Sequence, residues 1–154
     1  MDDSQQNIFA TCIVYGELGI LLRGESGAGK SLLALDLLDR AEIRGFDAFL
    51  VSDDRVILDV NEDGLIASAP ANISGQIELR GCGVIGRPTV HQTQIHLLID
   101  LVDVVDRMPE NEEFEIELQG VKIARCPVPK RELIDSVHQR LLVIEAMKRV
   151  RKTL

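Results

Sequence analysis

Apolar and polar positions along the chain follow two periods, one typical of strands and one typical of helices. Compact apolar runs between turn residues predict strands, and leucines at helical spacing predict a helix directly after a glycine-rich loop. The predicted strands cover residues 8–15, 20–23, 46–54, 56–60, 65–69, 77–79, 95–102 and 114–123. The predicted helices cover residues 31–43 and 132–150. This order predicts an α/β fold with a strand-rich sheet over residues 1–154, organised as one domain.

Two strand pairs are predicted to be hairpins. A Gly16-Glu17 turn leads from the run at 8–15, which is apolar at successive positions and therefore predicted to be buried on both faces, into the run at 20–23. The sequence NEDG between 56–60 and 65–69 is a second hairpin turn signal.

The helix predicted at the C-terminal end is amphipathic and basic. One apolar stripe contains Ile134, Val137, Leu141 and Ile144, and it could pack on the protein's own sheet or on another chain. The basic residues Lys130, Arg131, Arg140, Lys148 and Arg149 suit an interface. The acidic stretch at 100–117 is predicted to be a solvated rim.

Composition narrows the possible function classes. The chain has 154 residues with 45% hydrophobic and 27% charged positions, which is typical of a folded globular domain. A net charge of −8 gives no field to attract nucleic acid or an anionic membrane, so we expect neither as a partner. The three cysteines lack metal-site spacing, and no secretory segment or apolar run of roughly 20 residues occurs, so we expect a protein of the cytoplasm.

The clearest chemical signal is GESGAGKS at residues 24–31, which matches G-x-x-x-x-G-K-[ST] between a predicted strand and a predicted helix. Its glycines allow backbone N–H groups to surround a phosphate at a helix N-terminus. Lys30 can reach the β- and γ-phosphates of ATP, and the Ser31 hydroxyl can bind Mg²⁺. A glycine-rich turn without a ligand is the alternative. The residues expected to bind ATP are Gly24, Glu25, Ser26, Gly27, Ala28, Gly29, Lys30 and Ser31.

Two adjacent acids, Asp53 and Asp54, follow the apolar run of the third predicted strand. Acids at the carboxyl end of a strand lie on the edge where the phosphate loop opens. The pair could divide two tasks, in which one carboxylate orients Mg²⁺ or its waters and the other accepts a proton from an attacking hydroxyl. A single metal ligand beside an exposed turn acid is the alternative.

The segment IELRGCGVI at 77–85 places Glu78 and Arg80 two residues apart on a predicted strand, and therefore on one face. This pair could be part of an active site or a plain cross-strand ion-pair set.

Together these segments resemble the HPr kinase/phosphorylase family, in its short proteobacterial form without an N-terminal domain. GESGAGKS resembles the family's G-x-S-G-x-G-K-S loop, LVSDDRV its L-V-A-D-D-x-V segment, and IELRGCGVI its signature I-E-[IV]-R-G-x-G-I-I. ASAPANISG before the signature is also similar to short members. The chain departs from the family at Phe9, where members usually carry a histidine, and at Leu32, where an acid commonly follows the loop.

The resemblance implies a phosphate-loop kinase fold with a nucleotide site like that of phosphoenolpyruvate carboxykinases. It implies a bifunctional enzyme that uses ATP and Mg²⁺ to phosphorylate a serine of the phosphocarrier protein HPr, and removes that phosphate by phosphorolysis to give pyrophosphate. Asp53 would accept the serine proton and Arg80 would hold phosphate, while Asp54 and Glu78 would serve the metal with Ser31. Members are commonly hexamers, which implies a homo-oligomer here.

Two other functions are compatible with the sequence. A small-molecule phosphate-loop kinase would use the same nucleotide site, although 154 residues leave no room for a second lobe. The second alternative function is that of a nucleotide-sensing regulator with little phosphotransfer, because Phe9 replaces the family histidine.

Overall fold

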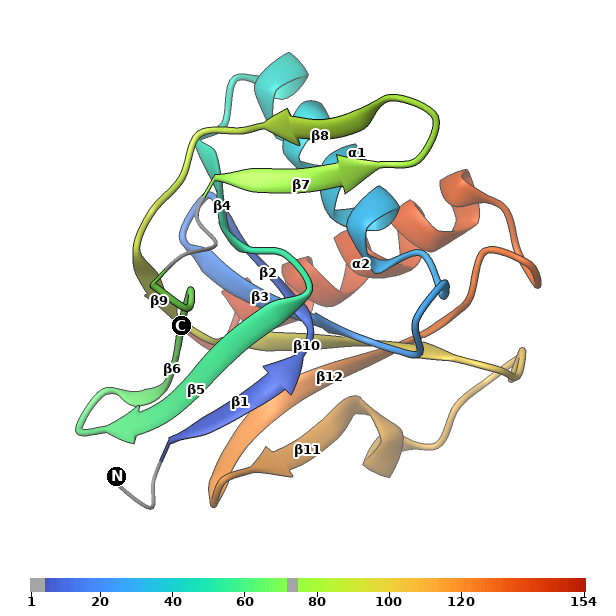
Figure 1. Ribbon diagram of the computed structural model, residues 1–154. Helices are drawn as coiled ribbons and strands as arrows, with labels where there is room; N and C mark the ends of the chain where they lie inside the picture. Colours follow the sequence, from blue (N-terminus) through green and yellow to red (C-terminus); the bar gives the residue numbers. More distant parts are fainter. Residues whose placement is uncertain (1–4, 72–74) are drawn as a thin grey trace.

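The most apolar segments of the chain pair into one mixed sheet of six strands, in the order β11-β12-β10-β3-β2-β4. The computed structural model describes residues 5–71 and 75–154 (Figure 1). Residues 72–74, which belong to the ASAPANISG segment, lie outside the described residues. The six strands are β2 (Thr11–Tyr15), β3 (Leu18–Arg23), β4 (Ala48–Ser52), β10 (Leu97–Val102), β11 (Glu115–Leu118) and β12 (Val121–Pro129).

The directions of the strands in this sheet determine which strand ends lie on the same edge. Strands β3, β10 and β12 run parallel, and β2 lies antiparallel between β3 and β4. Strands β3 and β4 therefore point the same way, and their carboxyl ends lie on the same edge as the beginning of β2.

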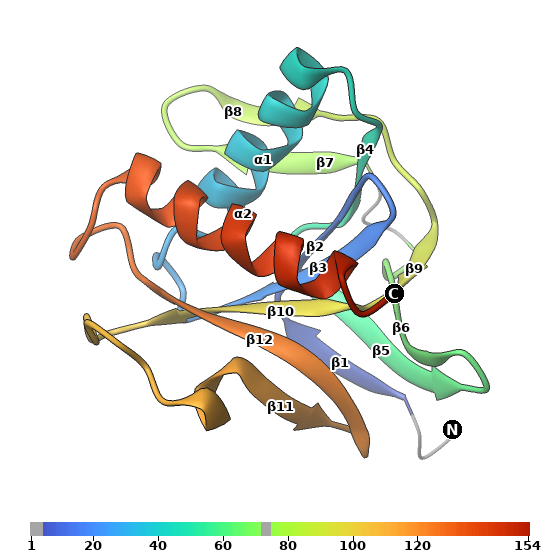
Figure 2. The same ribbon diagram turned by 180° about the vertical axis from the view of Figure 1, so that it is seen from behind.

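The two faces of the sheet are covered differently, as Figures 1 and 2 show. The helices α1 (Lys30–Arg44) and α2 (Ser136–Arg151) cover one face, with Leu97 and Ile99 of β10 in the core beneath them. A four-stranded antiparallel sheet covers the other face, where Leu98 is buried. Its strands are β1 (Gln6–Phe9), β5 (Arg55–Asn61), β6 (Gly64–Ser68) and β9 (Gln92–Gln94).

A separate hairpin of β7 (Gln76–Leu79) and β8 (Gly83–Gly86) packs beside α1. Ile77 of this hairpin is buried in the core beneath the helices, and Arg87 just after it lies 3.2 Å from Asp39 of α1. A 3₁₀ turn, η1 (Asn111–Phe114), precedes β11. No helix in the described part of the chain is long and apolar enough to cross a membrane.

The α/β class and both predicted hairpins are confirmed, since β2 pairs with β3 and β5 with β6. The first helix differs from its prediction by one residue at each end, and Gly45 ends it in the left-handed conformation at φ 78°.

The prediction of one strand over 8–15, buried on both faces, is wrong. The chain turns at Ala10, whose N–H donates to the carbonyl of Asp54 at 3.1 Å, so β1 joins the small sheet and β2 the large one. Phe9 is 62% exposed. Both halves are apolar, so the hydrophobic pattern carries no sign of the crossover.

The predicted strand at 114–123 is also two strands. Gln119 and Gly120 both have positive φ, 50° and 80°, which makes a tight hairpin turn between β11 and β12. Sequence gives only a weak turn signal here, because Gln is not a favoured residue at positive φ.

The C-terminal helix begins at Ser136 rather than 132, because Asp135 caps it by accepting a hydrogen bond from the N–H of His138 at 2.8 Å. Lys130 and Arg131, grouped above with the basic residues of this helix, lie several residues before it. The predicted apolar stripe faces the sheet only in part, since Ile144 packs against the core whereas Val137 and Leu141 are 54% and 60% exposed. The residues of α2 that pack inward are Gln139, Val143, Ala146, Met147 and Val150.

Asp100 is not part of a solvated rim, although it begins the acidic stretch. It lies in β10 between Arg23 of β3, at 2.9 Å, and Arg125 of β12, also at 2.9 Å. Burial by itself opposes ionisation of Asp100, but hydrogen bonds and charge from Arg23 and then Arg125 outweigh it, so the pKa lies below its ordinary value. This ion-pair network joins the three parallel strands.

We expect Asp100→Asn to lower the free energy of unfolding at neutral pH by about 1.5–3 kcal/mol, because two arginines lose a charged acceptor. Asp100 has a depressed folded-state pKa, so its stabilisation is present above the unfolded value of about 3.9 and is lost as pH falls through the folded value. Chemical denaturation from pH 7 to pH 2 measures this. Between pH 7 and pH 2 the Asp100→Asn variant should lose less free energy of unfolding than the wild type, because it has no Asp100 carboxylate to protonate. As a control, Glu145→Gln at an exposed position should change the free energy of unfolding by less than about 0.5 kcal/mol.

Candidate active site

The loop at residues 24–31 joins β3 to α1 at the carboxyl edge of the large sheet. Gly27 and Gly29 adopt positive φ values of 83° and 99°. A Cβ at Gly24 would lie 2.9 Å from the Cβ of Leu101, so this position allows only glycine without movement of the sheet. The loop conformation therefore depends on these three glycines.

The side chain of Lys30 folds back over the preceding residues of the loop. Its ammonium group donates to the carbonyl oxygens of Gly24 at 2.7 Å and Glu25 at 3.0 Å. These contacts keep the positive charge beside the loop backbone, where a loop-bound phosphate would lie.

Asp53 is the buried centre of the site, with 8% of its surface exposed. A single carboxylate oxygen, Oδ1, accepts hydrogen bonds from the hydroxyls of Ser31 at 2.7 Å and Thr11 at 2.8 Å. The expectation that the acid after β4 meets the loop edge agrees with this geometry. Sequence reasoning did not single out Thr11, although a hydroxyl residue inside an otherwise apolar run was an available signal.

Asp54 has a different environment from its neighbour. It is exposed, and its backbone has the unusual positive φ of 71°. The N–H of Arg55 donates to the carbonyl of Asp53 at 2.9 Å, which closes a tight turn around Asp54. The side chain of Asp54 makes no hydrogen bond or ion pair with the part of the chain that the structure describes.

Glu78 and Arg80 are not in contact with the acids or with Lys30. Ile77 is buried and Leu79 is half-buried against the helices, so Glu78 is on the exposed side of β7, and Arg80 lies in the turn beyond the strand. Within residues 5–71 and 75–154, neither side chain has a hydrogen-bond or ion-pair partner. The plain ion-pair set considered from sequence is therefore absent among these residues.

Two cations lie nearer the loop than the sequence suggested. Because β12 runs parallel to β3 and β10, its last residues reach the same edge, and Arg131 Cδ would lie 3.3 Å from a Cβ at Gly29. Lys130 lies 2.9 Å from Asp103, and the hydrogen bond and charge of Asp103 raise its pKa. From the sequence both residues are expected only as part of the basic surface at the C-terminal helix.

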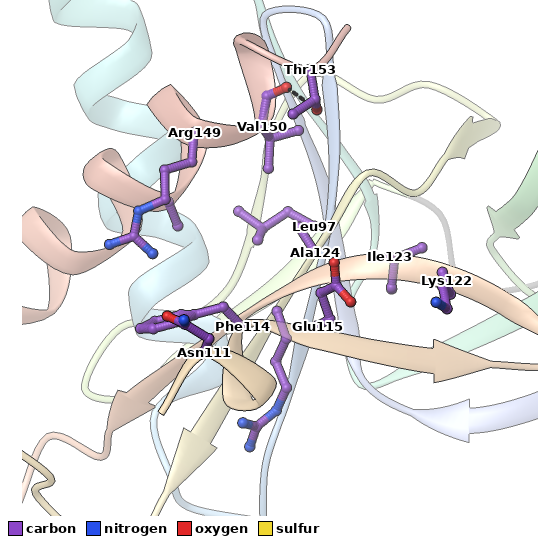
Figure 3. A pocket seen from close by; sticks show the side chains of 12 residues that line it. Leu97, Asn111, Phe114, Glu115, Lys122, Ile123, Ala124, Arg149, Val150 and Thr153 are labelled. Carbon is purple, nitrogen blue, oxygen red and sulfur yellow. Dashed lines mark hydrogen bonds between the residues drawn. The ribbon is translucent and has the colours of Figure 1, made fainter. Parts of the chain in front are cut away.

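Two pockets lie beside the helices. One, of about 310 Å³, borders the loop at Gly29 and is lined by Leu32, Leu79 and Arg131 among others. The other, of about 630 Å³, lies between α2 and β12 and shares no residue with the loop. There Arg149 stacks on Phe114, with 4.7 Å from the guanidinium carbon to the ring centre (Figure 3). The loop and the acids, rather than the larger pocket, carry the recognisable chemistry.

The contact between Ser31 and Asp53 fits a magnesium site. It brings a hydroxyl and a carboxylate within 2.7 Å, and Mg²⁺ prefers such oxygen donors. No group of three or more His, Cys, Asp and Glu side chains suited to a metal occurs among the described residues. Mg²⁺ in nucleotide sites needs only one or two protein ligands, since water and phosphate supply the rest.

The sequence matches the family model described as HPr Serine kinase C-terminal domain over residues 3–153. It is 37% identical over 129 residues to an HPr kinase/phosphorylase of Streptococcus thermophilus, covering 75% of this chain and 39% of that protein. A relative from Caldicellulosiruptor bescii with the same name is 37% identical over 133 residues, covering 77% of this chain and 40% of the relative. The chain thus spans about two fifths of the length of these relatives.

A solved structure, the Hpr(Ser) kinase/phosphatase from Coxiella burnetii, matches almost the whole chain. The TM-score is 0.75 at 27% sequence identity, and the match covers 97% of this chain and 99% of the other.

We expect Thr11→Val to lower the free energy of unfolding by about 1–2 kcal/mol, because the buried Asp53 carboxylate loses one of its two donors while the side-chain shape is kept. Urea denaturation measures this. Thr93→Val is the matched control, since among the described residues the Thr93 hydroxyl donates to the backbone carbonyl of Gln94 alone, at 3.2 Å. Thr11→Ser should restore most of the loss, and an equal effect of the two valine variants would contradict the role of Thr11.

Proposed function

The chain belongs to the HPr serine kinase C-terminal domain family, and from this premise we propose that it is an ATP-dependent serine kinase of the phosphocarrier protein HPr. We further propose that it removes the phosphate by phosphorolysis. The observation that carries the proposal is the contact of Ser31 with Asp53 at 2.7 Å, which joins a phosphate-binding loop to an acid pair.

In this proposal residues 24–31 bind the phosphates of ATP and Lys30 neutralises charge on the β- and γ-phosphates. Ser31 and Asp53 would hold Mg²⁺, which when bound offsets negative charge on the phosphates. Arg131 lies against the loop at Gly29 and supplies further positive charge at that edge.

The contacts of the two acids support exchanging the roles expected from the sequence. Asp53 is buried and its Oδ1 is already shared by Ser31 and Thr11, so it is suited to hold or orient the metal. Asp54 is exposed on a tight turn and its side chain lacks a partner among the described residues. We therefore propose Asp54 as the group that exchanges the proton.

Transfer then follows from the residues present. The serine oxygen of HPr attacks the γ-phosphorus, the bond to the ADP oxygen breaks, and the serine proton passes to the Asp54 carboxylate. In the reverse direction an oxygen of inorganic phosphate attacks the phosphoserine phosphorus, and the serine oxygen leaves with the proton from Asp54. The second product is pyrophosphate.

We propose that Arg80 and Glu78 act from the β7–β8 hairpin, Arg80 on phosphate and Glu78 on the metal or its waters. The hairpin packs on α1, the helix that begins at Lys30, which supports this placement. Neither side chain is tied to another described residue, so both can turn toward a bound phosphate.

We propose a homo-oligomer, a hexamer by family resemblance, in the cytoplasm. The exposed Val137 and Leu141 on α2 support an interface, because α2 packs on its own sheet with a different set of residues. The same surface could instead contact HPr.

Incubation with γ-³²P-labelled ATP, Mg²⁺ and purified HPr should place label on a serine of HPr. Lys30→Ala should abolish the transfer and weaken ATP binding more than tenfold, because the loop loses its cation, while circular dichroism shows an intact fold. Label on a small molecule would support the small-molecule kinase, and ATP binding without transfer would support a nucleotide sensor. Unchanged ATP affinity in the variant would contradict the loop assignment.

Asp54→Asn should lower the transfer rate by about 10²- to 10⁴-fold at every Mg²⁺ concentration, because the amide cannot take up a proton. Phosphorolysis should fall in parallel, with ATP affinity nearly unchanged. Asp53→Asn should instead raise the Mg²⁺ requirement, and excess Mg²⁺ should restore part of the rate. The opposite pattern would support Asp53 as the base, as first expected from the sequence.

A further inference from the structure

An exposed aromatic residue and an arginine are stacked at the border of the acid pair. Phe9 is the last residue of β1, and Arg55 lies directly opposite as the first residue of β5. The guanidinium carbon of Arg55 lies 4.3 Å from the centre of the Phe9 ring. Phe9 is 62% exposed, so core packing does not explain its presence. The ring contact instead fixes where the charge of Arg55 lies.

The backbone of Arg55 is held to the acid turn from both sides. Its N–H donates to the carbonyl of Asp53 at 2.9 Å, and its carbonyl accepts from the hydroxyl of Ser52 at 2.5 Å. On the neighbouring strand, the N–H of Ala10 donates to the carbonyl of Asp54 at 3.1 Å. Arg55 thus directly follows Asp54, and Phe9 directly precedes Ala10, which is hydrogen-bonded to Asp54.

The guanidinium of Arg55 has no acidic partner in the part of the chain that the structure describes. It forms no hydrogen bond or ion pair within residues 5–71 and 75–154, whereas several other arginines of this acidic chain are paired with aspartates. These are Arg23, Arg87, Arg125 and Arg140. Stacking on a ring uses the face of a guanidinium and leaves its N–H groups in the plane, where they can donate in pairs to the oxygens of a phosphate.

We propose that Arg55 binds a phosphate anion on the acceptor side of the acid pair, and that Phe9 is the positioning residue that holds it there. The anion is a phosphate monoester or free phosphate, which share the oxygens that Arg55 would contact. The inference deepens the proposed function, since it identifies the residue that would bind the phosphoserine of the partner or the phosphate that attacks it.

Binding can be measured without transfer by titrating either O-phosphoserine or inorganic phosphate into the protein loaded with ADP and Mg²⁺, followed by calorimetry. Arg55→Gln should weaken binding at least tenfold in one or both titrations, and Arg55→Lys should restore it only in part, because an ammonium group lacks the paired donors. A loss confined to one titration identifies the source of the anion. Unchanged affinity in both titrations would overturn the proposal.

Phe9 can be tested separately from Arg55. Phe9→Leu should weaken binding about two- to fivefold through loss of the cation–π contact, and Phe9→Tyr should keep wild-type affinity. Melting temperatures should change little, because the ring is exposed. The matched controls are Arg149→Gln and Phe114→Leu, which break the similar stack at 4.7 Å in the pocket of Figure 3. Equal losses in the control variants would show a general charge effect and overturn the site.

Kinetics distinguish this inference from the proposed function. If HPr is the substrate, Arg55→Gln should raise the KM for phosphoserine-HPr in phosphorolysis while ATP affinity stays unchanged. If the wild-type protein transfers no phosphate to HPr, the proposed function is wrong. The calorimetric titrations with the Arg55 variants still show whether Arg55 binds a phosphate anion.

Discussion

One carboxylate oxygen, Oδ1 of Asp53, holds together the parts of the chain that make up the site. It accepts hydrogen bonds from Ser31 at the start of α1 and from Thr11 at the start of β2. Three segments far apart in the sequence therefore meet at one buried atom. A buried carboxylate without donors is costly, so the phosphate loop, β2 and β4 are coupled in their positions.

This meeting point exists because β2 is inserted antiparallel between β3 and β4. The insertion brings the beginning of one strand and the ends of two others to a single edge. The turn at Ala10, just before β2, directs β1 into the second sheet and places Phe9 beside Arg55. The same backbone turn thus supports both the buried acid and the stacked arginine.

Charge is distributed unevenly over this fold. The net charge is −8, and most of the excess acid lies on exposed segments. In the sheet itself Asp100 is neutralised by Arg23 and Arg125, which stabilises the parallel strands. At the loop edge the Lys30 ammonium group donates to carbonyl oxygens and the Arg55 guanidinium lies over a ring, and neither has an acidic partner among the described residues. An anion is the natural complement of such cations, and this agrees with phosphate chemistry at this edge.

The phosphate-loop motif, the acids after β4, the two hairpins and the α/β class can all be predicted from the sequence, because each depends on short-range pattern: glycines at fixed spacing, an apolar run before an acid, and turn residues between strands. The sequence has limits that follow from the same dependence on short range. It could not show the break at Ala10, since apolar residues continue on both sides, whereas Asp135 was an available capping signal for the start of α2 at Ser136. Only the folded chain shows that Asp53 is the buried acid, that Thr11 donates a hydrogen bond to it, and that Phe9 is exposed beneath Arg55. These properties depend on which strands become neighbours, and strand order is set by packing of the whole chain rather than by any local segment.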